Sequence, residues 1–205
     1  MGLISLLFQE PLAFAVLAVS LLYSVIAHEV SHGLAASFFG DDTAKRAGRL
    51  TLNPLPHLDP IGALLLFFVG FGWARPVPVS YVRLSRTRLG MICVAMAGCV
   101  TNAFLAAISI FLLRSIKTNS FFREPLEILA LINVTLGAFN LIPIPPLDGS
   151  KVLLAFLPKE KWGVFAKWER YGLILLIVLM VTGVLKPVIL YAQNLIYWLI
   201  AYHPT

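Results

Sequence analysis

Charged residues are scarce in this chain, at 13% of its 205 residues, whereas hydrophobic residues make up 59%. Soluble globular domains carry charge on about a quarter of their residues, so this composition excludes a soluble protein, soluble peptidases included. The length suits one domain. We therefore expect a single membrane-embedded domain over residues 1–205, in a multi-pass integral membrane protein that contacts the lipid bilayer.

Cysteines and clusters of basic residues are scarce as well. Cys93 and Cys99 are six residues apart in one uncharged run, on roughly opposite faces of a helix, so we expect no disulfide between them. The net charge of +6 is spread over short loops, which indicates contact with anionic lipid and no binding of nucleic acid. Residues 1–10 contain no Lys or Arg and lack the basic start of a secretory signal, so we expect the first helix to be retained.

Long uncharged runs dominate the sequence and predict membrane helices, since a straight span needs about 20 apolar residues. Residues 60–74 form a run of only 15 residues with three glycines, so we expect this segment to re-enter the membrane and not to cross it. The other runs are residues 11–27 with their continuation 34–39, 89–113, 128–147, 171–185 and 187–202. The expected fold is all-α with about 5–6 transmembrane or re-entrant helical segments, a core over residues 11–157 and a C-terminal helical hairpin over residues 168–203.

Residues 73–84 interrupt the helical pattern. Val77, Val79 and Tyr81 alternate there with prolines and a serine, which is typical of an edge strand. We expect a small β-strand or hairpin element between the first and second long spans, where it could pair with an extended substrate backbone. The alternative is a surface loop.

The distribution of Lys and Arg predicts the orientation in the membrane. If residues 60–74 do not cross, eleven basic residues lie in loops on one side and four on the other, with Lys151 inside a span. Cytoplasmic loops carry the excess of basic residues, so the first side is expected to be cytoplasmic. His32 and Asp148 then both lie toward the cytoplasmic ends of their helices and can meet at one depth. The short loops favour a prokaryotic plasma membrane.

The first apolar run contains His28, Glu29 and His32, an H-E-x-x-H pattern inside a membrane helix. Residues four apart lie about 40° apart around a helix, so both imidazoles face one way at a spacing that fits one Zn²⁺. The carboxylate beside them could accept a proton from water without binding the metal. The alternative is a pair of core histidines bonded to neighbouring helices, although ionisable residues in a membrane segment are costly and indicate function.

A catalytic zinc takes three protein ligands, so one more must come from elsewhere. No further His follows at a short spacing, and Glu124 and Glu127 lie toward the opposite membrane face. Asp41 and Asp42 directly follow the helix end, where solvated acidic residues are common. Asp148 remains as the candidate for the third ligand.

The surroundings of Asp148 favour this role. The preceding stretch, from Asn140 to Leu147, contains three prolines, and Gly149 follows. Prolines remove backbone donors and open a helix, and Gly149 permits a turn, so the carboxylate can point inward. Broken helix at membrane depth is tolerated where it lines a protein cavity. The alternative is a proline-rich interfacial loop with an incidental Asp.

The two motifs together resemble the site-2 protease family of intramembrane zinc metalloproteases. H-E-x-x-H matches at residues 28–32, N-x-x-P-x-x-P-L-D-G matches at residues 140–149, and the resemblance covers about residues 11–157. It implies hydrolysis of peptide bonds within or near transmembrane helices of membrane-protein substrates, in regulated intramembrane proteolysis, with Glu29 as the catalytic base. It also implies one Zn²⁺ per chain with three ligands: His28, His32 and Asp148.

Three further residues are candidates for substrate binding. His57 starts a stretch, residues 57–62, that resembles a loop of small bacterial members, and a loop-capping histidine is the alternative. Asn102 ends a stretch that resembles G-P-x-x-N in the family but has Cys99 in place of the proline, which puts the kink of that motif in doubt. Asn140 and Asn102 could bind the unwound substrate backbone or help to hold the oxyanion.

Larger members of the family add PDZ or CBS modules, and this compact form has no room for either. We therefore expect regulation by membrane partners or by the membrane core itself. The rival functions are a zinc transporter and a catalytically inactive zinc-binding membrane protein. A transporter needs intramembrane acidic or histidine residues along a path across the bilayer, whereas this chain gathers them at one depth. An inactive relative would be expected to lack the base, and Glu29 is present.

Overall fold

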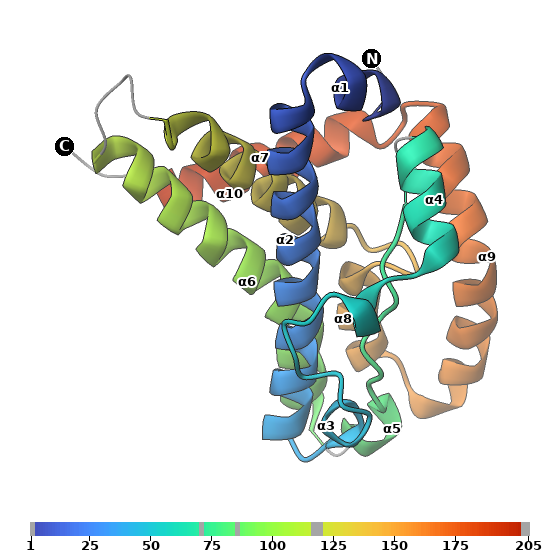
Figure 1. The fold of residues 1–205 in the computed structure, drawn as a ribbon. Coiled ribbons are helices and arrows are strands. Elements are labelled where there is room, and N and C mark those ends of the chain that lie inside the picture. Colours follow the sequence, from blue (N-terminus) through green and yellow to red (C-terminus); the bar gives the residue numbers. More distant parts are fainter. Residues whose placement is uncertain (1–2, 70–71, 85–86, 116–120, 202–205) are drawn as a thin grey trace.

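The computed structural model describes residues 3–69, 72–84, 87–115 and 121–201. This part of the chain is all-helical and contains no strand, as Figure 1 shows. The helices are α1 (Leu3–Gln9), α2 (Pro11–Phe38), α3 (Thr43–Arg46), the 3₁₀ helix η1 (Leu55–His57), α4 (Pro60–Val69), α5 (Tyr81–Leu84), α6 (Arg88–Ser115), α7 (Arg123–Asn140), α8 (Asp148–Phe156), the 3₁₀ helix η2 (Lys159–Lys161), α9 (Trp162–Val181) and α10 (Lys186–Ala201).

Two described helices, α2 and α6, are long and apolar enough to cross a bilayer, with 28 residues each. This finding, with the composition, makes the chain a membrane protein. The helix α4 has only ten residues, fewer than a straight span needs. The helix α7 begins with Arg123 and Glu124 and carries Glu127 one turn later, so only its second part is uncharged. The number of spans beyond α2 and α6 stays a prediction.

The helices α9 and α10 would add a third span if the bent pair forms one, and they meet at 91° across a short break. The two helices therefore form a corner. The C-terminal helical hairpin expected for residues 168–203, of which 202 and 203 lie outside the described residues, stays a prediction. In Figure 1 α9 stands at the right of the molecule and α10 passes behind α2.

The β element expected at residues 73–84 is wrong for the described residues. Residues 72–80 have no regular secondary structure, and Tyr81–Leu84 forms α5. The backbone N–H groups of this segment are bonded to other elements: Arg75 N–H to the His57 carbonyl (2.8 Å), Val77 N–H to Glu29 Oε2 (2.8 Å) and Ser80 N–H to Asp41 Oδ2 (2.6 Å). The two prolines among them, Pro76 and Pro78, have no N–H to offer, so the segment lacks the regular row of free donors that a partner strand needs.

Small residues bring the central helices together. Ala36 on α2 and Ala95 on α6 are fully buried, as are Ala106 on α6 and Ala138 on α7. Such residues let helix backbones approach closely, which is the usual basis of helix packing in membranes. The helix α8 adds Leu154 and neighbouring apolar residues to the cluster formed by α2 and α6. Both cysteines, which lie on α6, are free, as expected.

Asp41 joins the end of α2 to residues 72–80 and α5. Its carboxylate is fully buried and accepts hydrogen bonds from Thr43 N–H (3.2 Å), the Thr43 hydroxyl and Ser80 N–H, and it pairs with Arg83 Nη1 at 3.4 Å. Burial raises the pKa of Asp41, but these hydrogen bonds outweigh burial, so the pKa lies below its ordinary value of 3.8. The expected solvated residue is therefore a structural anchor.

We expect Asp41→Asn to lower the free energy of unfolding by about 1–3 kcal/mol at neutral pH, because charged acceptors of several hydrogen bonds are costly to lose. A lowered pKa in the folded state stabilises the fold above the unfolded value of 3.8. The difference between native and variant protein should thus persist above that pH and vanish as the pH falls through the lowered value. Thermal unfolding in detergent measures this difference. Asp42→Asn is the control, because the Asp42 carboxylate accepts one side-chain hydrogen bond, from Ser37 Oγ.

Candidate active site

The two histidines of α2 are buried and face each other. His28 and His32 are 5% and 7% exposed, their rings meet edge to face, and their Nε2 atoms lie 3.1 Å apart. The four-residue spacing on one helix therefore places both rings on the same face, as expected.

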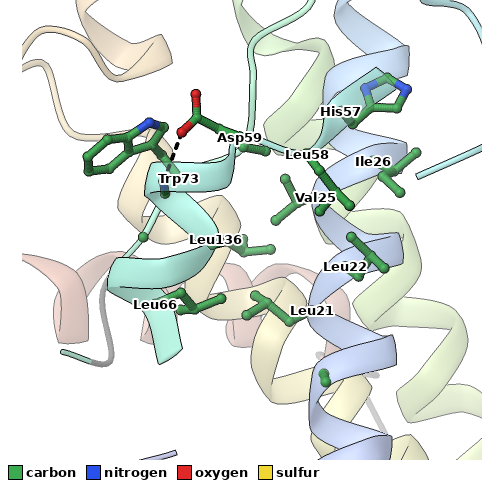
Figure 2. A pocket seen from close by; sticks show the side chains of 15 residues that line it. Leu21, Leu22, Val25, Ile26, His57, Leu58, Asp59, Leu66, Trp73 and Leu136 are labelled. Carbon is green, nitrogen blue, oxygen red and sulfur yellow. Dashed lines mark hydrogen bonds between the residues drawn. The ribbon is translucent and has the colours of Figure 1, made fainter. Parts of the chain in front are cut away.

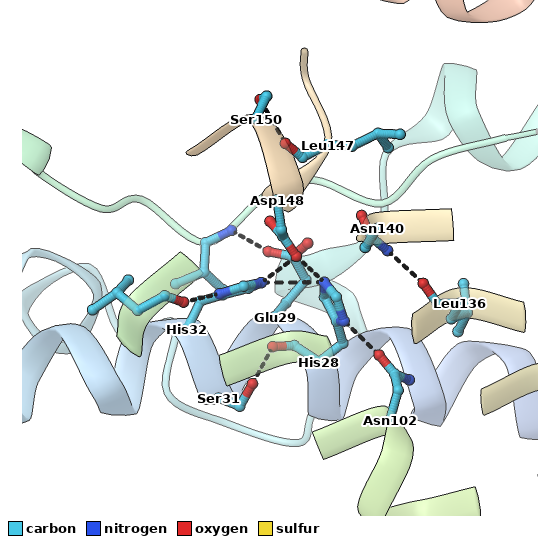
Figure 3. Close-up of polar contacts among 12 residues, drawn as sticks. His28, Glu29, Ser31, His32, Asn102, Leu136, Asn140, Leu147, Asp148 and Ser150 are labelled. Atoms are coloured by element: carbon cyan, nitrogen blue, oxygen red, sulfur yellow. Dashed lines mark hydrogen bonds and ion pairs between the residues drawn. The ribbon is translucent and has the colours of Figure 1, made fainter. Parts of the chain in front are cut away.

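Asp148 approaches the two histidines from a distant part of the chain. It is the first residue of α8, and its Oδ2 lies 3.0 Å from His28 Nε2 and 3.1 Å from His32 Nε2. Figure 3 shows the carboxylate above the two rings. The turn that brings it there depends on Gly149, because a Cβ at this position would lie 2.3 Å from the Leu141 carbonyl oxygen. A residue with a side chain would therefore push the start of α8 away from the end of α7.

The donor set fits a zinc ion. His28 Nδ1 lies 2.5 Å from Asn102 Oδ1, and His32 Nδ1 lies 2.7 Å from the Val94 carbonyl oxygen. Because both partners are acceptors, each Nδ1 carries a proton, which leaves Nε2, on the side of the carboxylate, as the nitrogen that can bind a metal. Three lone-pair donors this close repel one another unless a cation lies between them. Ligands at about 2.0–2.1 Å from a tetrahedral zinc lie roughly 3.3 Å from one another, close to the observed separations.

A buried chain of hydrogen bonds leads away from His28 across three helices. Asn102 Nδ2 on α6 donates to Asn133 Oδ1 on α7 (2.8 Å), and Asn133 Nδ2 donates to Ser24 Oγ (2.8 Å), one turn before His28 on α2. Asn102 and Asn133 are fully buried and Ser24 is 1% exposed. Both ends of the Asn102 amide are therefore engaged, so its placement favours orienting His28 over the substrate contact expected for it.

The ring of His28 also rests directly on the backbone of α6. A Cβ at Gly98 would lie 2.3–2.5 Å from three ring atoms of His28, so any side chain there would displace the imidazole. Gly98 belongs to the stretch in which Cys99 replaces a proline. The helix α6 runs through this stretch from Arg88 to Ser115.

Glu29 lies beside the two histidines and outside the group of three donors. Its Oε2 accepts the hydrogen bond from Val77 N–H at 2.8 Å, so residues 72–80 hold this carboxylate in place. A hydrogen bond to one oxygen leaves the other available as a proton acceptor. The arrangement can therefore supply a base next to a metal site.

Two other expected residues, Asn140 and His57, do not join this group. Asn140 ends α7, is half-buried and donates from Nδ2 to the Leu136 carbonyl (3.0 Å), and its amide keeps a further donor and acceptor. His57 is 1% exposed, and its Nε2 bonds to the Thr51 carbonyl (2.9 Å), while its own backbone oxygen accepts from Arg75. His57 thus ties the loop after α3 to residues 72–80.

An apolar cavity of about 310 Å³ lies between α2 and α4. Figure 2 shows Leu22, Val25 and Ile26 of α2 on one side and Leu66 of α4 on the other. Its lining on α2 ends at Ile26 and includes neither Glu29 nor the three donors. Its apolar lining suits hydrocarbon side chains.

Comparison with known proteins decides the family. The model of "Peptidase family M50" matches residues 114–182. A Bacillus subtilis protein named "Putative zinc metalloprotease YwhC" is 41% identical over 177 residues, which cover 81% of this chain and 80% of that relative. The chain belongs to peptidase family M50. This confirms the resemblance to the site-2 proteases and makes the chain a metalloprotease.

More distant M50 relatives are similar as well. "Putative zinc metalloprotease Rip2" of Mycolicibacterium smegmatis is 29% identical over 86% of this chain and 70% of its own length. "Zinc metalloprotease MJ0392" of Methanocaldococcus jannaschii is 26% identical over 72% of this chain and 36% of its own length. No solved structure matches the chain significantly.

Three residues of the site in this M50 chain were not predicted from the sequence: Asn133, Ser24 and Gly98. The signal for the first two was a polar side chain inside an uncharged helical run, which is costly in a membrane unless it is bonded. Gly98 opens the stretch that resembles G-P-x-x-N, but that pattern did not indicate its contact with the His28 ring.

We expect Asn102→Leu to weaken zinc binding about 10–100-fold, the usual effect of removing a residue that orients a metal-binding histidine. Asn133→Leu should act in the same direction but less strongly, since it frees Asn102 and leaves His28 paired. Competition with a chelator in detergent measures the affinity. Ser109→Ala is the matched control, because Ser109 is equally buried on α6 but bonds to its own helix. Equal affinity in Asn102→Leu and Ser109→Ala would contradict the role of Asn102.

Proposed function

We propose that the chain is an intramembrane zinc metalloendopeptidase that hydrolyses peptide bonds within or beside transmembrane helices of membrane-protein substrates. One Zn²⁺ per chain would be held by His28, His32 and Asp148. The observation that carries the proposal is the triangle of lone-pair donors, with sides of 3.0–3.1 Å, on a helix long and apolar enough to cross a membrane.

Glu29 is the proposed catalytic base. His28, His32 and Asp148 would hold the zinc, which when bound would supply Lewis acidity to polarise a carbonyl and activate water. Glu29 accepts the proton of the attacking water as the new C–O bond forms, and returns it to the leaving nitrogen as the C–N bond breaks. Val77 N–H holds the carboxylate during both transfers.

A membrane-embedded substrate fits the surroundings of the site. A peptide bond in a helix is sheltered by its own hydrogen bonds, so the substrate must unwind locally, and Asn140 can offer its amide to the freed backbone. The apolar cavity between α2 and α4 can take side chains of the unwound segment. His57 would act at a distance from the chemistry, by holding the cavity wall.

Location and orientation remain part of the proposal. The excess of basic residues in the loops beside the C-terminal end of α2 supports a cytoplasmic position for the active site, in a prokaryotic plasma membrane. Regulation by membrane partners is likewise a proposal.

We expect Glu29→Gln to slow cleavage about 10²–10⁴-fold while zinc stays bound, because the amide cannot accept the proton. The substrate is a single-helix reporter reconstituted with the protein, and a soluble peptide with the same scissile sequence is tested beside it. Glu127→Gln, on the exposed face of α7, is the control. Native-rate cleavage by Glu29→Gln would refute the mechanism, and preference for the soluble peptide would refute the substrate class.

We expect about one zinc per purified chain. Asp148→Ala should weaken zinc binding by more than about 10–100-fold, the effect typical of residues that only orient a ligand, because it removes a ligand itself. Metal analysis after dialysis against a chelator measures it. Glu160→Ala, twelve residues further along and exposed, is the control. If Asp148→Ala bound zinc as tightly as the native chain, Asp148 would not be a zinc ligand, and the two motifs would not form one site.

A further inference from the structure

Arg49 and Arg75 line a cavity of about 380 Å³ beside residues 72–80. The rest of its lining is Ala47 and three prolines, at positions 56, 76 and 78. Alanine carries no polar side-chain group, and proline lacks even a backbone N–H. The two guanidinium groups are therefore the charged groups of this cavity.

Arg49 is 9% exposed and incompletely paired. Its Nη2 donates to the Arg75 carbonyl oxygen at 2.7 Å, whereas its Nε has no hydrogen-bond partner among the described residues. Within the same described ranges, neither arginine takes part in an ion pair. A buried charged donor without an acceptor is costly, and a bound water or ion is the usual explanation.

The electrostatics of the cavity favour an anion. Burial lowers the pKa of Arg49, and the positive charge of Arg75 lowers it further, while the Glu29 carboxylate partly offsets both. Burial and the charge of Arg75 therefore both disfavour the charged form of the Arg49 guanidinium group. An anion in the cavity would supply acceptors to the two arginines that line it and would offset their like charges.

We propose that Arg49 and Arg75 bind a phosphate group, supplied by the headgroup of an anionic phospholipid or by free phosphate. The planar guanidinium fork matches phosphate geometry, and one phosphate group has enough oxygens for two forks. Arg49 lies in the loop after α3, beyond the end of α2, and lipid headgroups lie at the ends of membrane-spanning helices. The site is separate from the three donors and from the chemistry proposed above.

Binding there would reach the candidate base through the backbone. A phosphate group on both arginines links the loop after α3 to residues 72–80, and Val77, two residues beyond Arg75, donates to Glu29. Lipid headgroups would then help to keep this segment across the active site.

The test uses the full zinc-loaded chain in an uncharged detergent. Its melting temperature is followed against inorganic phosphate, short-chain phosphatidylglycerol and a short-chain monoacylglycerol that controls for the acyl chain. Arg75→Gln is the main variant, because Arg75 is exposed and its backbone oxygen, which pairs with Arg49, is retained. Arg46→Gln, exposed on α3 and outside the cavity, is matched in charge. Zinc content is checked in every sample, since phosphate can also bind zinc.

We expect phosphatidylglycerol to raise the melting temperature of the native chain and of Arg46→Gln. Arg75→Gln should need a roughly tenfold higher lipid concentration for the same rise, because it loses one charged hydrogen-bonded contact. If inorganic phosphate acts likewise, the free anion is a sufficient ligand. If only the lipid acts, the headgroup is the source. An equal response of Arg75→Gln and Arg46→Gln, or no response to either phosphate probe, overturns the proposal whatever the protease activity.

Discussion

His28 Nε2, His32 Nε2 and Asp148 Oδ2 lie 3.0–3.1 Å apart, and keeping three lone-pair donors together inside a membrane protein constrains everything around them. Lipid offers no hydrogen bonds, so the second nitrogen of each ring must find its acceptor within the helices. The helix α6 supplies both acceptors, from the Val94 carbonyl and the Asn102 amide. Asn102 in turn donates a hydrogen bond to Asn133 on α7. The hydrogen bonds of this one site therefore fix how α2, α6 and α7 are rotated relative to one another.

The centre of the site could be predicted because its information is local. Two histidines four residues apart on a helix must share a face, and the prolines before Asp148 mark a place where helix gives way to a turn. The partners of these residues could not be predicted in the same way. The contact of Asn133 with Asn102 and Ser24 depends on the rotation of three helices, and a sequence shows only that each side chain is polar in an apolar run.

The long helices α2 and α6 could be predicted directly from uncharged runs, whereas the sequence pattern did not predict the structure of residues 73–84. Alternation around Val77 and Val79 predicted a strand, but a strand needs a partner for its N–H groups, and these bind His57, Glu29 and Asp41 instead. Hydropathy likewise marks α9 and α10 as apolar without indicating the 91° between them. That angle depends on packing against the rest of the chain.

The contact at Gly98 has a consequence for motion. The His28 ring rests on the α6 backbone there, and four residues earlier the Val94 carbonyl holds His32, so neither helix can slide or turn without breaking a buried contact. The helices α2 and α6 should therefore behave as one rigid body. Residues 72–80, in contrast, are bonded through single backbone N–H groups to Glu29 on α2, to Asp41 after it and to His57, so this segment can move with fewer buried contacts broken.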